Sequence, residues 1–293
     1  MNANSINVRT QDGRTIHIID AGPAGGIPVV VHHGTPGSAR LYGPAVEDAQ
    51  RRGLRLIGYD RPGYGGSTPR PGRAVADAAE DVAAIAKAMD LKRLLTWGHS
   101  GGGPHALACA ALLPDLVAAA AALSAPAPYW GDATWLEGMG EDNVHEFGAA
   151  LESREAVEKF VEAFAPGMLN ADAKSLVEAM RTLLSPPDVA ALTESLADHL
   201  IEQVREGVMG RRDGWIDDDL AFTRPWGFDP ESIRVPVLIL QGEQDKMVPF
   251  EHGRQLARHT PAAEVRLLPE EGHLTMLTAR LPEVHAWLLE KWK

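Results

Sequence analysis

Cysteine is almost absent from this chain of 293 residues, which contains a single one, Cys109. A lone cysteine excludes an intramolecular disulfide and is typical of a protein from a reducing compartment. Because Cys109 lies in an alanine-rich segment with helical character, we expect it to be a buried packing residue. The fold must then rest on a hydrophobic core, for which 45% hydrophobic residues in a chain of this length are sufficient.

Positive charge is also scarce. Lysine and arginine number 28 against 40 aspartates and glutamates, which gives a formal net charge of −12. An acidic balance argues against binding to a phosphate backbone and to anionic membrane surfaces. We therefore expect no nucleic acid and no membrane among the partners, and a small molecule as the ligand.

Long hydrophobic runs are missing as well. The longest alanine-rich stretch, Val117–Leu123, is far too short to span a bilayer. The segment Met1–Arg14 is polar and has no apolar core of the kind found in signal peptides. We expect a soluble, cytoplasmic protein.

Short apolar runs separated by helical spacing are what the chain does contain. Runs that are apolar throughout are typical of parallel strands covered on both faces, and the alternation of strand and helix indicates an α/β fold with right-handed crossovers. The expected strands are Asn4–Thr10, Thr15–Asp20, Pro28–His32, Leu54–Tyr59, Arg93–Trp97, Val117–Leu123, Val235–Leu240 and Glu264–Leu268.

The alternation stops between residues 126 and 231, where the pattern predicts helices over 153–164, 173–184 and 188–208. We expect a core domain formed by residues 1–125 and 232–293, with a helical cap of residues 126–231 inserted into it. The cap holds more than half of the chain's aromatic residues. That excess suggests an apolar substrate pocket, with these wall residues: Trp130, Trp135, Trp215 and Trp226.

The most informative motif is Gly98-His99-Ser100-Gly101-Gly102, which follows a predicted strand and precedes a helix. The glycines let the chain reverse sharply, so that the Ser100 hydroxyl is exposed at the apex of a strained turn. Ser100 is therefore the candidate nucleophile. His99, inside this turn, is expected to have a structural role.

A serine hydroxyl needs a histidine to accept its proton and a carboxylate to orient that histidine. In this topology both follow the nucleophile, at the ends of later strands, in the order acid then histidine. Asp245 follows the run Val235–Leu240, with Glu243 as its nearest rival, and His273 follows the last strand. We expect Asp245 and His273 to complete the catalytic set.

Ester hydrolysis also needs backbone N–H donors for the negative charge that develops on the carbonyl oxygen. The residue after the nucleophile, Gly101, should supply one donor. The loop after the strand Pro28–His32 should supply the other, and since Pro36 has no N–H, we expect Thr35 to do so. Asp60 and Arg61, in a glycine-rich loop, are expected to support this oxyanion loop.

Other chemistry leaves no signature in the chain. No cluster of cysteine, histidine and carboxylate has metal-ligand spacing, and neither a G-x-G-x-x-G nor a Walker loop is present. We expect no cofactor and no metal.

With these motifs in this order, the chain resembles the α/β-hydrolase superfamily over nearly its whole length. The resemblance implies a mostly parallel eight-stranded sheet with helices on both faces, a helical cap inserted after strand six, and a Ser-His-Asp triad formed by Ser100, His273 and Asp245. It also implies hydrolysis of a carboxylic ester or lactone through an acyl-enzyme. The aromatic cap suggests a small, hydrophobic substrate.

Three alternatives remain open on the sequence. The segment Thr35-Pro36-Gly37 is similar to one in proline iminopeptidases, although those enzymes usually carry a tryptophan beside the nucleophile, where this chain has His99 and Gly101. Cofactor-free dioxygenases and C–C bond hydrolases resemble the same scaffold. A ligand-binding module without catalysis is the third.

Overall fold

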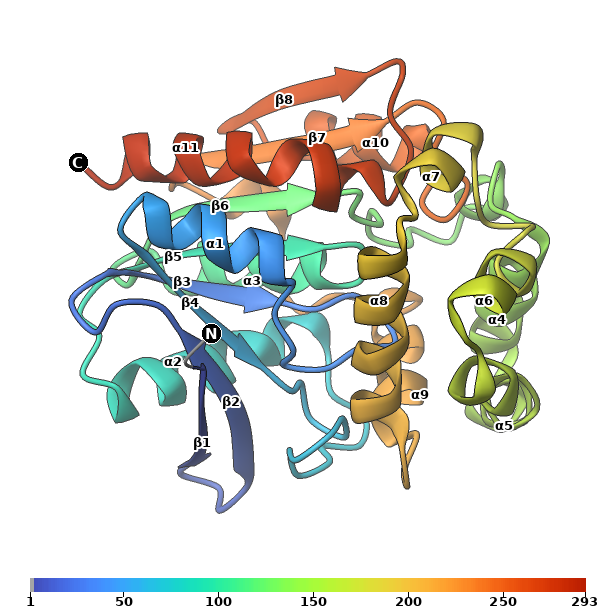
Figure 1. The fold of residues 1–293 in the computed structure, drawn as a ribbon, viewed down its shortest axis with the longest axis horizontal. Helices are drawn as coiled ribbons and strands as arrows, with labels where there is room; N and C mark the ends of the chain where they lie inside the picture. The colour runs from blue at the N-terminus through green and yellow to red at the C-terminus, as the bar shows by residue number, and fades with distance from the viewer. Residues whose placement is uncertain (1–2) are drawn as a thin grey trace.

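A twisted sheet forms the centre of the molecule (Figure 1). The structure, a computed structural model, describes residues 3–293, and within them eight strands pair in the order β1-β2-β4-β3-β5-β6-β7-β8. β1 and β2 run antiparallel to their neighbours, and all pairs from β4 to β8 are parallel. The strands are β1 (Ala3–Arg9), β2 (Thr15–Ala21), β3 (Ile27–His32), β4 (Leu54–Tyr59), β5 (Leu94–His99), β6 (Val117–Leu123), β7 (Val237–Gly242) and β8 (Ala263–Leu268).

The central strands are apolar throughout because both faces of the sheet are covered. Along β7, Val237 and Ile239 belong to one hydrophobic core, while Leu238 and Leu240 belong to another on the opposite face. The first core includes side chains of α2 (Ala78–Ala88), α3 (Gly102–Leu112) and α10 (Phe250–His259). The second includes side chains of α1 (Gly43–Arg51) and α11 (Leu281–Lys291). The expected α/β fold, with a mostly parallel eight-stranded sheet between helical layers, is confirmed.

Six α-helices lie between β6 and β7 in the chain. They gather at the end of the sheet to which the parallel strands point, with α8 and α9 nearer the sheet than α4, α5 and α6 (Figure 1). Val161, Val204 and Trp215, from α5, α8 and α9, belong to a hydrophobic core that is separate from the two cores of the sheet. The helices are α4 (Glu141–Glu152), α5 (Arg154–Asn170), α6 (Ala173–Ala179), α7 (Pro186–Ala191), α8 (Glu194–Val208) and α9 (Asp213–Phe222).

The helices in this region differ from those predicted. The single helix expected over 188–208 is two, because Thr193 has an extended backbone and its hydroxyl accepts a 3.3 Å hydrogen bond from the Leu196 N–H, which starts α8. The pattern missed α4 and α9 altogether. In α9 three consecutive aspartates obscured the helical pattern, yet all three are buried. No helix within residues 3–293 has both the length and the apolar composition needed to cross a bilayer.

Candidate active site

Ser100 lies at the apex of the turn between β5 and α3. Its φ angle is 55°, a left-handed conformation that is strained for serine. The Ser100 N–H donates to the Leu123 carbonyl at 2.8 Å, and the Gly103 N–H donates to the Ser100 carbonyl at 2.9 Å. A Cβ atom at residue 98 would collide with the backbone of Gly102, so the tight turn requires glycine there. The strand-turn-helix geometry that the motif predicted is present.

His273 and Asp245 lie together at the ends of the last two strands. The Nδ1 atom of His273 is 2.8 Å from Asp245 Oδ2. The other oxygen, Asp245 Oδ1, accepts hydrogen bonds from the Met247 and Val248 N–H groups at 2.9 and 2.8 Å. Burial disfavours the charged imidazole, but the Asp245 carboxylate outweighs it and raises the pKa of His273. A His273 ring that donates from Nδ1 leaves Nε2 as the acceptor.

A second carboxylate, Asp188, holds the His273 loop from the side of α7. It is fully buried, and its Oδ1 accepts a 2.7 Å hydrogen bond from the Leu274 N–H. Its Oδ2 accepts from the Ser185 hydroxyl at 2.7 Å. Sequence reasoning missed Asp188. The only signal was the spacing Ser185-x-x-Asp188, which is that of a helix cap.

His99 supports the same loop through its ring. Its Nε2–H donates to the His273 carbonyl at 3.0 Å, and the two ring centroids are 4.6 Å apart. Burial lowers the pKa of His99 well below its usual value, so the ring is neutral. These contacts fit the structural role expected for it.

The loop of Gly34, Thr35 and Pro36, called the oxyanion loop because it is expected to supply an oxyanion donor, lies beside Ser100. A Cβ built on Gly34 would lie 3.6 Å from Ser100 Cβ, and one built on Gly101 would collide with the Thr35 side chain. Within residues 3–293 the backbone N–H groups of Thr35 and Gly101 have no acceptor. Both expected donors therefore lie beside Ser100, and their N–H groups are available to an acceptor.

Arg61 holds this loop in place through hydrogen bonds. Its guanidinium donates to the carbonyls of His33 and Gly34 and to the Thr35 hydroxyl, the last at 3.0 Å. It also pairs with Asp218, a fully buried residue of α9. The expectation that Arg61 supports the oxyanion loop agrees with these contacts.

Asp218 was not found from the sequence, although it is the centre of this network. It accepts hydrogen bonds from the Thr35 and Tyr64 hydroxyls at 2.7 and 2.8 Å and forms a second ion pair with the buried Arg73. Burial opposes its ionisation, but Arg61 and Arg73 hold the pKa of Asp218 well below the usual range. An aspartate of α9 thus fixes the loop that carries the Thr35 amide.

Two cavities of about 110 Å³ each border Ser100. The α4 cavity is lined by Gly101 and by side chains of α4, among them Glu146 and Phe147. The α8 cavity is lined by His273 and by side chains of α8, among them Ile201 and Val204. The shared lining residues are Thr35, Pro36, Ser100, Met168, Met180 and Met247.

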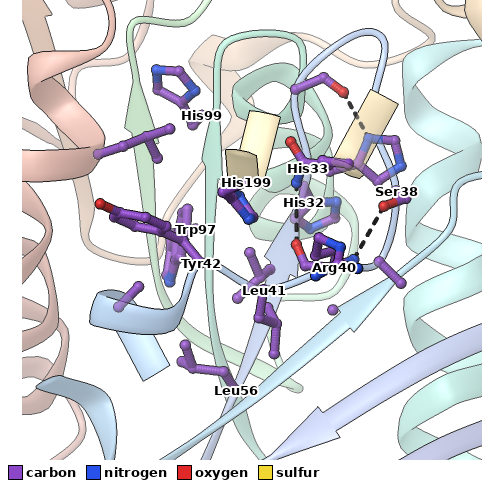
Figure 2. A pocket seen from close by; sticks show the side chains of 17 residues that line it. His32, His33, Ser38, Arg40, Leu41, Tyr42, Leu56, Trp97, His99 and His199 are labelled. Carbon is purple, nitrogen blue, oxygen red and sulfur yellow. Dashed lines mark hydrogen bonds between the residues drawn. The ribbon is translucent and has the colours of Figure 1, made fainter. Parts of the chain in front are cut away.

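A smaller third cavity, the rear cavity, of about 40 Å³, lies behind the oxyanion loop. Figure 2 shows it between His33, His99 and His199, close to Tyr42. Burial, with the nearby Arg40, lowers the pKa of His199 to about 4, so this ring of α8 is neutral near pH 7.

Of the four tryptophans expected to wall the substrate pocket, only Trp215 lines a cavity beside Ser100. Trp130 is 52% exposed and packs on His259. Trp135 is buried and donates from Nε1 to the Ala127 carbonyl at 2.8 Å, and Trp226 belongs to a hydrophobic core of the sheet. Aromatic enrichment did not distinguish a pocket wall from ordinary packing. Phe147, Phe164 and Phe222 contribute the other aromatic surface of the α4 cavity.

Within residues 3–293 no group of three or more histidine, cysteine or carboxylate side chains has the arrangement of a metal site. His273 lines the α8 cavity together with Ser100 and is held by Asp245.

Known proteins are similar to this chain in sequence and in fold. A family model described as the alpha/beta hydrolase fold matches residues 27–279. A non-heme chloroperoxidase of Streptomyces lividans is 32% identical over 83% of this chain and 83% of its own. A bifunctional esterase/perhydrolase of Acinetobacter calcoaceticus is 28% identical, again over 83% of each chain. The crystal structure of a bromoperoxidase from Bacillus anthracis has a TM-score of 0.72 at 23% identity, covering 99% of this chain and all of that one, and supports the fold. The chain therefore belongs to the α/β-hydrolase family and is an enzyme of the hydrolase class.

Proposed function

We propose that the enzyme hydrolyses carboxylic esters through an acyl-enzyme formed on Ser100. The observation that carries the proposal is the pairing of His273 with Asp245 beside Ser100, with Ser100 and His273 lining one cavity. Esterases among the related proteins support the same chemistry. The apolar walls around Ser100 favour a small ester with hydrophobic parts.

In the first half of the reaction, the Ser100 hydroxyl attacks the ester carbonyl while His273 Nε2 takes its proton. Asp245 keeps the His273 proton on Nδ1 and stabilises the imidazolium. The carbonyl oxygen, now negative, accepts hydrogen bonds from the Thr35 and Gly101 amides. The bond to the alcohol then breaks, and the alcohol leaves with the proton from His273.

In the second half, water attacks the acyl-Ser100 ester and gives a proton to His273. Collapse of the second tetrahedral intermediate releases the carboxylic acid and returns the proton to Ser100. Arg61 and Asp218 take no part in proton transfer. Their role is to hold the Thr35 amide in place before charge develops.

The test is hydrolysis of p-nitrophenyl acetate and butyrate by the wild-type enzyme and by Ser100→Ala. We expect activity that falls by roughly 10³-fold or more in the variant. A fluorophosphonate probe should label the wild type at Ser100 and leave Ser100→Ala unlabelled. A folded wild-type protein that neither turns over esters nor takes the label would reject the proposal.

Perhydrolysis is a second candidate, favoured by the chloroperoxidase and the esterase/perhydrolase among the relatives. Hydrogen peroxide in place of water would attack acyl-Ser100 and release a peracid. Acetate, peroxide and bromide would then brominate monochlorodimedone in the presence of the wild type but not of Ser100→Ala. Equal bromination by both proteins would reject this second activity.

A further inference from the structure

The α4 cavity has one polar wall that the proposed mechanism does not use. Asp142, Asn143 and Glu146, all from α4, line it, whereas most of the remaining lining is apolar or aromatic. Among the described residues no lysine, arginine or histidine lines this cavity. Because Ser100 borders the same space, a molecule held at the polar wall lies next to the proposed nucleophile.

Glu146 forms a carboxyl pair with Asp219 of α9. Asp219 is fully buried, and within residues 3–293 neither of its oxygens meets an N–H or O–H donor. A buried carboxylate without a donor is strongly disfavoured, which favours the protonated form of Asp219 beside Glu146. Burial, together with the charges of Glu146 and Asp218, raises the pKa of Asp219 well above its usual value.

Glu146 is the ionisable member of this pair. Its Oε1 atom accepts a hydrogen bond from Trp215 Nε1 at 2.5 Å, whereas its Oε2 atom does not. Burial raises the pKa of Glu146 to about 7, with Asp142 adding to the effect and the Trp215 and Asp219 hydrogen bonds opposing it. At pH 8 the pair therefore carries one negative charge at the edge of an apolar cavity.

The neighbours of Glu146 extend this wall of acceptors. The Asn143 amide nitrogen donates to the Met247 carbonyl at 3.0 Å, and the Asn143 amide oxygen can accept a hydrogen bond from a ligand. Asp142 accepts a hydrogen bond from the Thr182 hydroxyl. The wall thus offers acceptors and negative charge, and the complementary ligand is a positively charged donor.

We propose that Glu146, with Asp142 and Asn143, forms a subsite for an ammonium group, and that the substrate is an acyl compound that carries one. Aromatic side chains favour the same ligand, since Phe164 and Trp215 border the cavity in an edge-to-face pair with centroids 6.4 Å apart. The substrate class rests on the proposed ester hydrolysis. The binding of a cation at the subsite does not depend on that proposal.

Binding is tested first, in a Ser100→Ala background at pH 8, by calorimetry with hexylammonium and with hexan-1-ol. We expect hexylammonium to bind at least about tenfold more tightly than the alcohol. Glu146→Gln should abolish this preference while leaving hexan-1-ol binding within about twofold. The matched control is Glu141→Gln, which removes the same charge from an exposed position of α4 and should retain the preference.

Equal affinity for the two ligands, or an unchanged preference in Glu146→Gln, would overturn the subsite. If Glu146→Gln fails to fold by circular dichroism, Asp142→Asn replaces it, because Asp142 lies on the same wall and is only half-buried. Its expected result is a severalfold loss of hexylammonium binding, and an unchanged affinity would overturn the subsite equally.

Turnover is tested second, with 4-methylumbelliferyl esters of 6-aminohexanoic acid and hexanoic acid. A kcat/KM at least about tenfold higher for the amino ester, lost in Glu146→Gln, would support the substrate class. Hydrolysis of both esters with no preference would overturn the substrate class and keep the esterase. Tight hexylammonium binding without hydrolysis of any ester would keep the subsite and overturn the proposed function.

Discussion

The His273 loop is held by a carboxylate that takes no part in the proposed chemistry. Asp188 accepts from the Leu274 N–H and from Ser185, and so ties the loop to α7. We expect Asp188→Asn to lower kcat by roughly tenfold with little change in KM, since a small misplacement of the base slows proton transfer. Steady-state kinetics on p-nitrophenyl butyrate check this.

Asp198→Asn is the matched control for that change. Asp198 is exposed on α8, so this variant should keep the wild-type kcat. A wild-type kcat in Asp188→Asn would show that the Asp188 charge is not needed to position His273.

The pH dependence of activity should follow the His273–Asp245 pair. His273 must be neutral to accept the Ser100 proton, so kcat/KM should fall as the pH drops through its raised pKa. In Asp245→Asn the attraction of that carboxylate is gone, and burial is opposed only by the weaker attraction of Asp188. The acid limb should therefore move to lower pH while kcat drops by roughly 10⁴-fold. A pH profile of kcat/KM for both proteins measures this, and an acid limb that stays in place would contradict it.

Cation binding in the α4 cavity should also depend on pH, through the protonation of Glu146. Asp142 of the same helix and Asp219 of α9 face Glu146, whose pKa is about 7. Above that value Glu146 is charged and binds an ammonium group, and below it the proton weakens binding. The affinity for hexylammonium should fall severalfold between pH 8 and pH 6, as measured by a calorimetric titration at each pH. An affinity that does not change with pH would show that Glu146 is not the group involved.

At the scale of elements, α9 connects the helices between β6 and β7 to the oxyanion loop. Asp218 of this helix is the shared partner of Arg61, Arg73 and Thr35. We expect Asp218→Asn to lower the free energy of unfolding by about 3–5 kcal/mol, since two buried guanidinium groups lose their counter-ion. Urea denaturation measures the change.

Asp213→Asn is the control on the same helix, because Asp213 is exposed at its first turn. It should leave the free energy of unfolding within about 0.5 kcal/mol of the wild type. A similarly small loss for Asp218→Asn would mean that water reaches Arg61 and Arg73.

The strands were predictable from the sequence, and the helices between β6 and β7 only in part. A central strand such as β7 is apolar at every position, a pattern that needs no knowledge of its neighbours. Helix α9 contains Asp217, Asp218 and Asp219, which sequence reasoning places on a surface. They are buried because their partners, Arg61, Arg73, Arg154 and Glu146, come from distant parts of the chain.

The proposed catalytic residues could be found for a similar reason. Ser100, Asp245 and His273 each follow a strand, so their meeting is a consequence of topology that the order of the chain already contains. Asp188 and Glu146 come from the helices between β6 and β7, where no periodic pattern fixes which face meets the site. Their positions required the structure.

For the whole molecule, the net charge of −12 should act on substrates at a distance. A negative protein attracts a cationic ester and has no long-range effect on a neutral one. We expect kcat/KM for the 6-aminohexanoyl ester to fall severalfold between about 10 mM and about 500 mM salt, because the ions screen the field. The hexanoyl ester should change little over the same range, and parallel salt profiles for the two esters would contradict this.

The buried contact between Asp218 and Thr35 also limits how new specificities can be built on this scaffold. Exchanging the helices between β6 and β7 for those of a relative looks like a way to replace only the substrate-facing surface. Here such an exchange would remove the carboxylate that holds the proposed oxyanion donor and would leave two buried arginines without their counter-ion. In a working chimera, Asp218, Arg61 and Arg73 must therefore all come from the same parent protein.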